Sequence, residues 1–144
     1  MKPNYLTILI TTLCIFFNAC HNSNTAPQLQ LADSLIDKRA DSALCILEKL
    51  SIEEISNKSA KAMYALLLTE ALDKNFKSHR NDSLILIAVD YYKDNSNNKL
   101  KTKAYYYLGR VYQDNKEYIK ATRSLSNSFK NSIPKPSSNI TNIQ

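Results

Sequence analysis

The sequence contains very little glycine and proline and no tryptophan. One glycine and four prolines stand among its 144 residues, so the chain lacks the turn residues that a protein of many short strands requires. A single glycine also excludes the glycine-rich loops that bind phosphate groups. Alanine, aliphatic residues and tyrosine recur instead with a period near 3.6 residues, which predicts an all-α protein.

Cysteine and histidine are also scarce, at three and two residues. Cys14 lies in an apolar N-terminal segment, and Cys45 lies in ALCILEKL, where its apolar neighbours predict a small core residue. His21 and His79 are far apart in sequence and have no cysteine or acidic pair at ligand spacing. No serine has the surroundings of a catalytic nucleophile. We therefore expect no metal site, no cofactor and no enzymatic activity.

Acidic residues are outnumbered, with 13 Asp and Glu against 19 Lys and Arg, for a net charge of +6. Most of the basic residues are scattered over the polar faces of expected helices, which favours a solvated surface over a nucleic-acid groove. The densest basic cluster is KLKTK at 99–103. We expect no nucleic-acid partner for this segment.

The first 19 residues have the pattern of an export signal. Lys2 precedes an uncharged, mainly apolar run over 5–17, which is shorter than the roughly 20 residues that cross a bilayer. The following FNAC, at 17–20, resembles a bacterial lipobox. This resemblance implies a lipoprotein signal peptide over 1–19 and an acyl anchor on Cys20. The alternative is an ordinary secretory signal followed by an unrelated cysteine.

Residues 20–28 are expected to form the lipidated cysteine and a flexible polar spacer. The spacer HNSNTAPQ contains no acidic residue. In the lipoproteins that it resembles, acidic residues at this place mark export to the outer face, so their absence implies a periplasm-facing position in the cell envelope. The segment 134–144, with two of the four prolines, is expected to be a disordered tail.

Amphipathic helices are expected from residue 29 onward. Their predicted ranges are 29–38, 41–50, 58–76, 82–94, 99–113 and 116–130. Side chains that can cap helix N-termini precede four of them: Asn57, Asn81, Asn98, and Asp114 or Asn115. Ser51 and Glu54 have capping-box spacing and predict a short extra turn. The short connections predict antiparallel neighbours. In the last helix, the apolar residues predicted to face the core are Tyr118, Ala121, Leu125 and Phe129.

The only glycine, Gly109, stands within AYYYLGRVY in an expected helix, where glycine costs about 1 kcal/mol relative to alanine. Its surroundings resemble the tetratricopeptide repeat, a helix pair of about 34 residues. The repeat-packing positions are Tyr64, Leu67, Leu68 and Ala71 in an earlier copy and Tyr105, Leu108, Gly109, Tyr112, Ala121 and Leu125 in a later one. The offset from Tyr64 to Tyr105 is 41 residues. In that family, a small residue at the position of Gly109 lets the second helix approach closely.

The resemblance covers 29–133, because ADSALCILEKL is similar to the second helix of a degenerate first unit. It predicts antiparallel helix pairs stacked as a short tetratricopeptide-type solenoid. The whole chain resembles a group of tetratricopeptide lipoproteins from Gram-negative anaerobes, as a short or truncated member. This implies a membrane-tethered scaffold that binds another protein or peptide. The alternative is the periplasmic sensory segment of a longer membrane-bound signalling or transcription-regulating protein.

Helical repeats bind partners on a concave surface lined by the first helix of each pair. The candidate partner-binding residues are Asn75, Lys103, Tyr106, Tyr107 and Arg110. The alternative for the tyrosines is that one of them packs against a neighbouring helix. No amphipathic capping helix follows the last expected helix, which predicts self-association through 116–130.

Overall fold

The structure, a computed structural model, describes residues 25–79 and 81–133. In these residues it contains six α-helices and no strand, so the predicted all-α class is confirmed. The helices are α2 (Ala26–Leu35), α3 (Ala40–Leu47), α4 (Lys58–Lys74), α5 (Ser83–Tyr92), α6 (Asn98–Asp114) and α7 (Tyr118–Ser132). None of the helices in this part of the chain is long and apolar enough to span a membrane. The predicted signal peptide, Cys20 and the tail lie outside the described residues.

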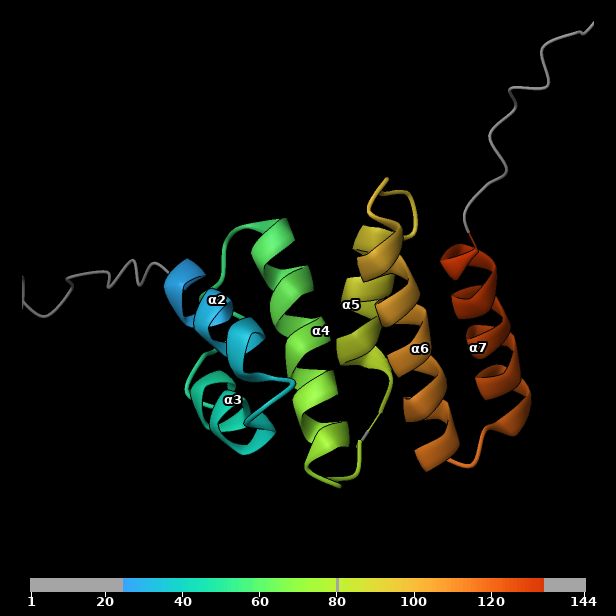
Figure 1. Ribbon diagram of the computed structural model, residues 1–144, viewed down its shortest axis with the longest axis horizontal. Coiled ribbons are helices and arrows are strands. Elements are labelled where there is room, and N and C mark those ends of the chain that lie inside the picture. Colours follow the sequence, from blue (N-terminus) through green and yellow to red (C-terminus); the bar gives the residue numbers. More distant parts are fainter. Residues whose placement is uncertain (1–24, 80, 134–144) are drawn as a thin grey trace, which may run out of the picture.

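The helices are arranged in chain order, and successive helices run in opposite directions (Figure 1). Each helix packs against the next, and α4 also contacts both α2 and α6. The helices α2, α4 and α6 therefore adjoin one another, and α4 is central to the molecule.

Two clusters of buried side chains form the core, and α4 contributes to both. One cluster joins α2 and α3 to α4 and includes Leu47 and Leu67. The other joins α4, α5 and α6 and includes Leu66 and Val111. Because α4 has buried residues on both sides, it links the two clusters into one molecule. Within the described residues, α7 contributes to neither cluster.

The helices α4 and α6 are built alike, and their ends are separated by 40 residues. Each helix has 17 residues. The caps Asn57 and Asn97 each accept a hydrogen bond from the backbone N–H three residues later, at 3.1 and 3.2 Å. Phe76 and Lys116 follow the two C-termini with φ of 55° and 62°, and the backbone bonds around them form Schellman motifs. Both helix ends therefore match at an offset of 40, one residue less than the 41 between Tyr64 and Tyr105.

The predicted cap of α4 is confirmed, but those of the last two helices are wrong. Asn98 is the first residue of α6, and Asn97 before it is the cap. Asp114 is the last residue of α6, and α7 begins after Glu117 without a side-chain cap. The carboxylate of Asp114 lies instead 2.7 Å from a ring nitrogen of His79. This long-range partner makes the acidic residue unavailable to α7.

Two segments near the N-terminus also differ from expectation. α2 begins at Ala26 instead of residue 29, so the end of the predicted spacer is helical. Pro27 lies in the first turn, where its missing N–H would have no helical partner. The short extra turn expected after Ser51 is present, because the Glu54 N–H donates to the Ser51 carbonyl at 3.2 Å. The Ser51 hydroxyl donates to Glu53, however, so Ser51 and Glu54 do not form a capping box.

Two burial predictions are wrong. Cys45 is exposed, because the short helix α3 buries Ala43, Leu44 and Leu47 on its opposite face. Tyr118 and Phe129, predicted to face the core, are 65% and 71% exposed. The buried residues of α7 are small ones: Ala121, Ser124 and Ser128.

Candidate functional site

Gly109, one of the predicted repeat-packing residues, lies against Ala121 and Leu125 of α7. A Cβ atom at this position would lie 2.7 Å from Leu125 Cγ and 3.4 Å from the Ala121 carbonyl oxygen. The missing side chain therefore makes room for α7. The other buried packing residues are Tyr64, Leu67, Ala71, Leu108 and Ala121. The partly buried ones are Leu68, Tyr105, Tyr112 and Leu125.

Two of the predicted partner-binding residues join α6 to α4 through ion pairs. Lys103 Nζ lies 2.5 Å from Glu70, whose side chain is only 2% exposed. Arg110 Nε donates to Asp73 at 2.9 Å. Lys74 Nζ lies 3.4 Å from the carboxylate of Glu70 and 2.6 Å from that of Asp37, which follows α2. The contacts join Asp37, Lys74, Glu70 and Lys103, and separately Asp73 and Arg110. These six residues are together termed the ion-pair row.

The electrostatics of the ion-pair row follow from these contacts. The hydrogen bond from Lys74 and its positive charge hold the pKa of Asp37 below its ordinary value. The hydrogen bond with Asp73 raises the pKa of Arg110. A carboxylate as buried as that of Glu70 needs compensating cations, because desolvation of an isolated charge is costly. The row therefore acts first as a connection between helices.

The predicted partner-binding tyrosines have opposite environments. Tyr107 is only 5% exposed and packs in the core among α4, α5 and α6, so its assignment to a partner surface is wrong. The alternative, that one tyrosine packs against a neighbouring helix, is confirmed for it. Tyr106 is 43% exposed and lies edge to face against Tyr107, with ring centroids 5.0 Å apart. Asn75 is the C-cap of α4, and its side chain donates to the Ala71 carbonyl at 2.7 Å.

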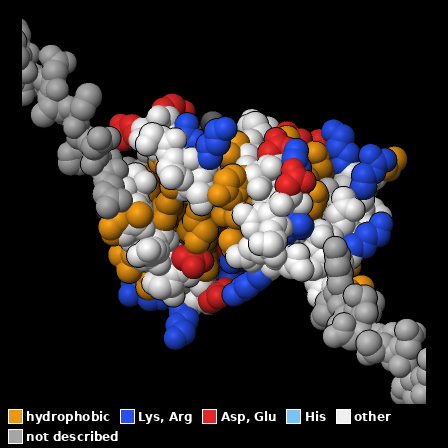
Figure 2. All heavy atoms as spheres, turned by 90° about the horizontal axis from the view of Figure 1, so that it is seen from above, with side chains coloured by type: hydrophobic (Ala, Val, Ile, Leu, Met, Phe, Trp, Pro, Cys, Tyr) orange, Lys and Arg blue, Asp and Glu red, His pale blue; other side chains and the backbone are white. Residues whose placement is uncertain are grey.

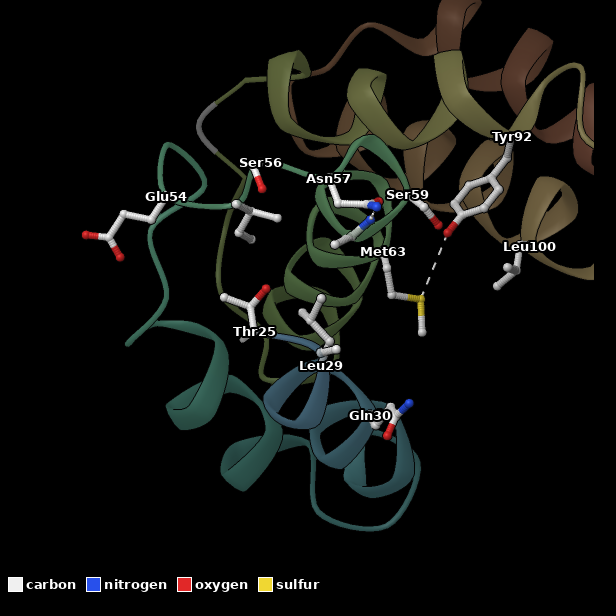
Figure 3. Close-up of a pocket in the computed structure, with 13 residues that line it drawn as sticks. Thr25, Leu29, Gln30, Glu54, Ser56, Asn57, Ser59, Met63, Tyr92 and Leu100 are labelled. Atoms are coloured by element: carbon white, nitrogen blue, oxygen red, sulfur yellow. Dashed lines mark hydrogen bonds between the residues drawn. The ribbon is translucent and has the colours of Figure 1, made fainter. Parts of the chain in front are cut away.

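One cleft of the described chain was not predicted from the sequence. It has a volume of about 690 Å³ and is formed by the start of α2, the segment before α4, the first turns of α4 and α6, and the end of α5 (Figure 3). Its lining residues are Thr25, Ala26, Leu29, Gln30, Glu54, Ile55, Ser56, Asn57, Ser59, Ala60, Met63, Tyr92 and Leu100. No local pattern could reveal it, because four separate segments contribute.

The cleft has an apolar floor and an uncharged polar rim. Leu29, Met63, Tyr92 and Leu100 come from four different helices, and the Tyr92 hydroxyl lies 3.9 Å from Met63 Sδ. Hydroxyl and amide groups of the lining stand beside these side chains. Glu54 is the one charged lining residue, and its side chain points away from the cleft (Figure 3). Such a lining suits apolar side chains of a ligand and a few hydrogen bonds.

A second unpredicted feature is the histidine in the loop between α4 and α5. His79 is 6% exposed, and its Nδ1 lies 2.7 Å from Asp114 while its Nε2 lies 3.1 Å from the Thr69 carbonyl. The loop is thereby connected to both α4 and α6. Asp114 is 35 residues away in sequence, which explains why spacing alone gave His79 no acidic partner. Across the described chain, no three potential metal-binding side chains converge.

Comparison with known proteins adds no relative to these observations. No protein-family model, no curated protein and no solved structure matches this chain. Function must therefore follow from the cleft, the ion-pair row and the helical arrangement.

Proposed function

We propose that this chain is a membrane-tethered scaffold of the tetratricopeptide type that binds a segment of another protein. Three structural features support the repeat assignment. Successive helices are antiparallel (Figure 1), α4 and α6 match over 17 residues each, and the only glycine lies at a close helix approach. Scaffolds of this kind act through surfaces and need no catalytic group.

The cleft is the observation that carries the binding function. An apolar floor large enough for side chains, within a rim of hydroxyl and amide groups, matches an extended segment of a partner protein. Of the described lining residues only Glu54 is charged, and its acidic side chain points away from the cleft (Figure 3), which favours an uncharged segment over a phosphate or carboxylate ligand. The ion-pair row holds α4 against α6 and so maintains the geometry of the cleft wall.

Site-specific photo-crosslinking in the native cell would test this function. A photo-reactive residue at Gln30, which is exposed and lines the cleft, should give a discrete crosslinked product. The same residue at Lys49, exposed and outside the cleft lining, is the matched control. Met63→Glu should abolish the product by placing a charge in the floor, whereas Met63→Leu should preserve it. Identical products at both positions, or a product insensitive to Met63→Glu, would argue against the cleft.

The membrane tether needs a separate test. Cys20→Ala should move the chain from the membrane fraction to the soluble periplasmic fraction if an acyl group on Cys20 is the anchor. An unchanged membrane fraction, measured on chains whose signal peptide has been removed, would eliminate the lipoprotein part of the proposal. The crosslinking result would be unaffected, so the two parts can fail independently.

A further inference from the structure

The outer side of α7 combines exposed apolar residues with basic ones. Three large apolar residues of α7, and Ile133 directly after the helix, are between 65% and 81% exposed and are termed the apolar stripe: Tyr118, Ile119, Phe129 and Ile133. With 3.6 residues per turn, Lys120, Arg123 and Lys130 project along the adjoining side of the helix, termed the basic flank. Lys120 also pairs with Glu117 and lies 5.2 Å from the ring centre of Tyr112. The outer side of α7 therefore carries exposed apolar residues along one edge, with the exposed Thr122 and Ser126 between them, and basic residues along the other edge.

The charge of the described chain is unevenly distributed. Residues 98–133 contain eight basic and two acidic side chains, whereas residues 25–79 and 81–97 contain eight basic and eleven acidic ones. Figure 2 shows Lys and Arg side chains gathered at the α7 end of the molecule. A positive end with few acidic residues attracts negatively charged partners.

The side of α7 that carries the apolar stripe has a counterpart on α5, and there the equivalent side is buried. In α5, Ile85 and Val89 flank the fully buried Ala88 and share a core cluster with residues of α6. In α7, Tyr118 and Thr122 stand in the same relation to the buried Ala121, but both are exposed. A following helix covers this side of α5, and no described residue covers it on α7.

We propose that the outer side of α7 binds an amphipathic helix of a partner protein, with apolar residues along one side and acidic residues beside them. The packing of α6 against α5 shows that a helix can occupy the equivalent position on α5. The positive charges of the basic flank favour a partner helix with acidic residues. A second copy meeting this one through α7 would bring two basic flanks together, which opposes self-association. The segment 134–144 contains no acidic residue and cannot supply the complementary charge. The outer side of α7 is separate from the cleft, and this proposal does not depend on ligand binding in the cleft.

Two synthetic peptides derived from α6 provide a matched probe, because α6 covers the equivalent side of α5. The acidic probe has the sequence of Asn98–Asp114 with glutamate replacing Lys99, Lys101, Lys103 and Arg110. The control peptide has the native sequence NKLKTKAYYYLGRVYQD. Fluorescence anisotropy with the purified full chain in nonionic detergent would measure both affinities. We expect the acidic probe to bind at least about tenfold more tightly, and its affinity to fall as salt screens the charges.

Variants of the full chain locate the binding. The double variant Arg123→Glu, Lys130→Glu should reverse the preference between the two peptides, which a purely structural role of these residues would not do. Phe129→Ser should weaken binding of the acidic probe at least about tenfold, while Phe76→Ser, at a 99% exposed phenylalanine of the α4–α5 loop, should leave it unchanged. Circular dichroism would verify that each variant retains its helical content.

Several outcomes would overturn the proposal. One is equal binding of the two peptides, and another is a preference that the double charge reversal leaves unchanged. If Phe129→Ser lowers the affinity of the full chain for phosphatidylglycerol vesicles but not for the acidic probe, the surface faces lipid instead of a protein helix. A dimer that dissociates in Phe129→Ser and whose formation excludes the probe would identify a second copy as the occupant.

Discussion

At the scale of single residues, the spacing between α6 and α7 depends on the absence of one side chain. Gly109 leaves its space to Leu125, which would lie 2.7 Å from a Cβ atom added at that position. Alanine improves helix propensity by about 1 kcal/mol, but real Cβ atoms do not approach other carbons so closely. The steric cost of a Cβ atom at position 109 should therefore exceed the gain in helix propensity.

We expect Gly109→Ala to destabilise the chain by about 1 kcal/mol and Gly109→Leu by about 3 kcal/mol, through overpacking. In a Leu125→Ala background, the same Gly109→Ala change should become neutral or stabilising, because the clashing atoms are gone. Denaturant unfolding of the four members of this double-mutant cycle measures the coupling. Additive effects of the two changes would show that α7 does not cross α6 at Gly109.

The buried tyrosine of α6 should make stability sensitive to alkaline pH. Burial, then the charge and hydrogen bonding of Glu70, raise the pKa of Tyr107 above its ordinary value of about 10. Tyr107 therefore loses its proton at lower pH in the unfolded chain than in the folded one. The stability that comes from burying the neutral Tyr107 is complete below pH 10 and decreases as the pH rises above it. The denaturation midpoint of Tyr107→Phe should fall less between pH 9 and pH 11 than that of the wild type. Tyr106→Phe, at an exposed ring, is the control and should retain the wild-type dependence.

Residue environments were the least predictable part of the molecule. Cys45, with apolar neighbours in sequence, is exposed because α3 turns its other side to the core. Adjacent tyrosines 106 and 107 differ by 100° around α6, and one is exposed while the other is buried. His79 is buried through contacts with Asp114 and Thr69. The burial or exposure of each of these residues depends on its neighbours in the folded structure, which sequence spacing does not identify.

At the scale of elements, the ends of α4 and α6 use the same backbone geometry with residues that are poorly suited to it. Phe76 and Lys116 occupy the left-handed region, which for residues other than glycine costs about 1–2 kcal/mol. Phe76 is 99% exposed, so its ring contributes no packing that a substitution would remove. Phe76→Gly should stabilise the chain by about 1 kcal/mol, measured by thermal or denaturant unfolding. Lys61→Gly, within α4, should have the opposite effect of about 1 kcal/mol, and destabilisation by Phe76→Gly would contradict the assigned turn.

One of the two ion pairs between α4 and α6 involves a buried carboxylate, that of Glu70. Lys103→Met removes the cation 2.5 Å from Glu70 and should destabilise the chain by about 3 kcal/mol. Lys93→Met, which removes an exposed pair with Asp90 within α5, should change stability by less than about 1 kcal/mol. Adding Glu70→Gln to Lys103→Met should recover part of the loss, because no buried charge is then left without its partner. Equal effects of the two lysine substitutions would show that Glu70 is not desolvated as the structure indicates.

The helices themselves followed largely from the sequence, whereas their ends and the cleft did not. Apolar periodicity predicted six helices within a few residues, and Asn57 was a correct cap because its partner is local. The ends of α4 and α6 are 40 residues apart, whereas Tyr64 and Tyr105 are 41 apart, so the two ways of matching the helices differ by one residue. The cleft requires Leu29, Met63, Tyr92 and Leu100 to converge from four helices, and periodicity gives no information on such convergence.

At the scale of the whole molecule, the central helix α4 and the last described helix α7 are connected to the core very differently. α4 contributes large apolar residues to both buried clusters, whereas α7 contributes to neither. The inner side of α7 fully buries only Ala121, Ser124 and Ser128, beside the partly buried Leu125. The Ser128 hydroxyl donates to the Thr102 carbonyl at 2.9 Å. Small side chains allow a close approach but bury little apolar surface, so the α6–α7 contact gains little hydrophobic stabilisation.

We therefore expect α7 to open before the rest of the molecule. In native-state hydrogen exchange, its amides should show the lowest protection of the six helices, and those of α4 should show the highest. The acidic α6-derived peptide should slow exchange in α7 selectively, because a helix covering the apolar stripe would supply the apolar contacts that this element lacks. The native-sequence peptide is the control and should leave exchange unchanged. Uniform protection from α4 through α7 would instead show that the chain unfolds as one cooperative unit, with α7 as firmly held as the central helix.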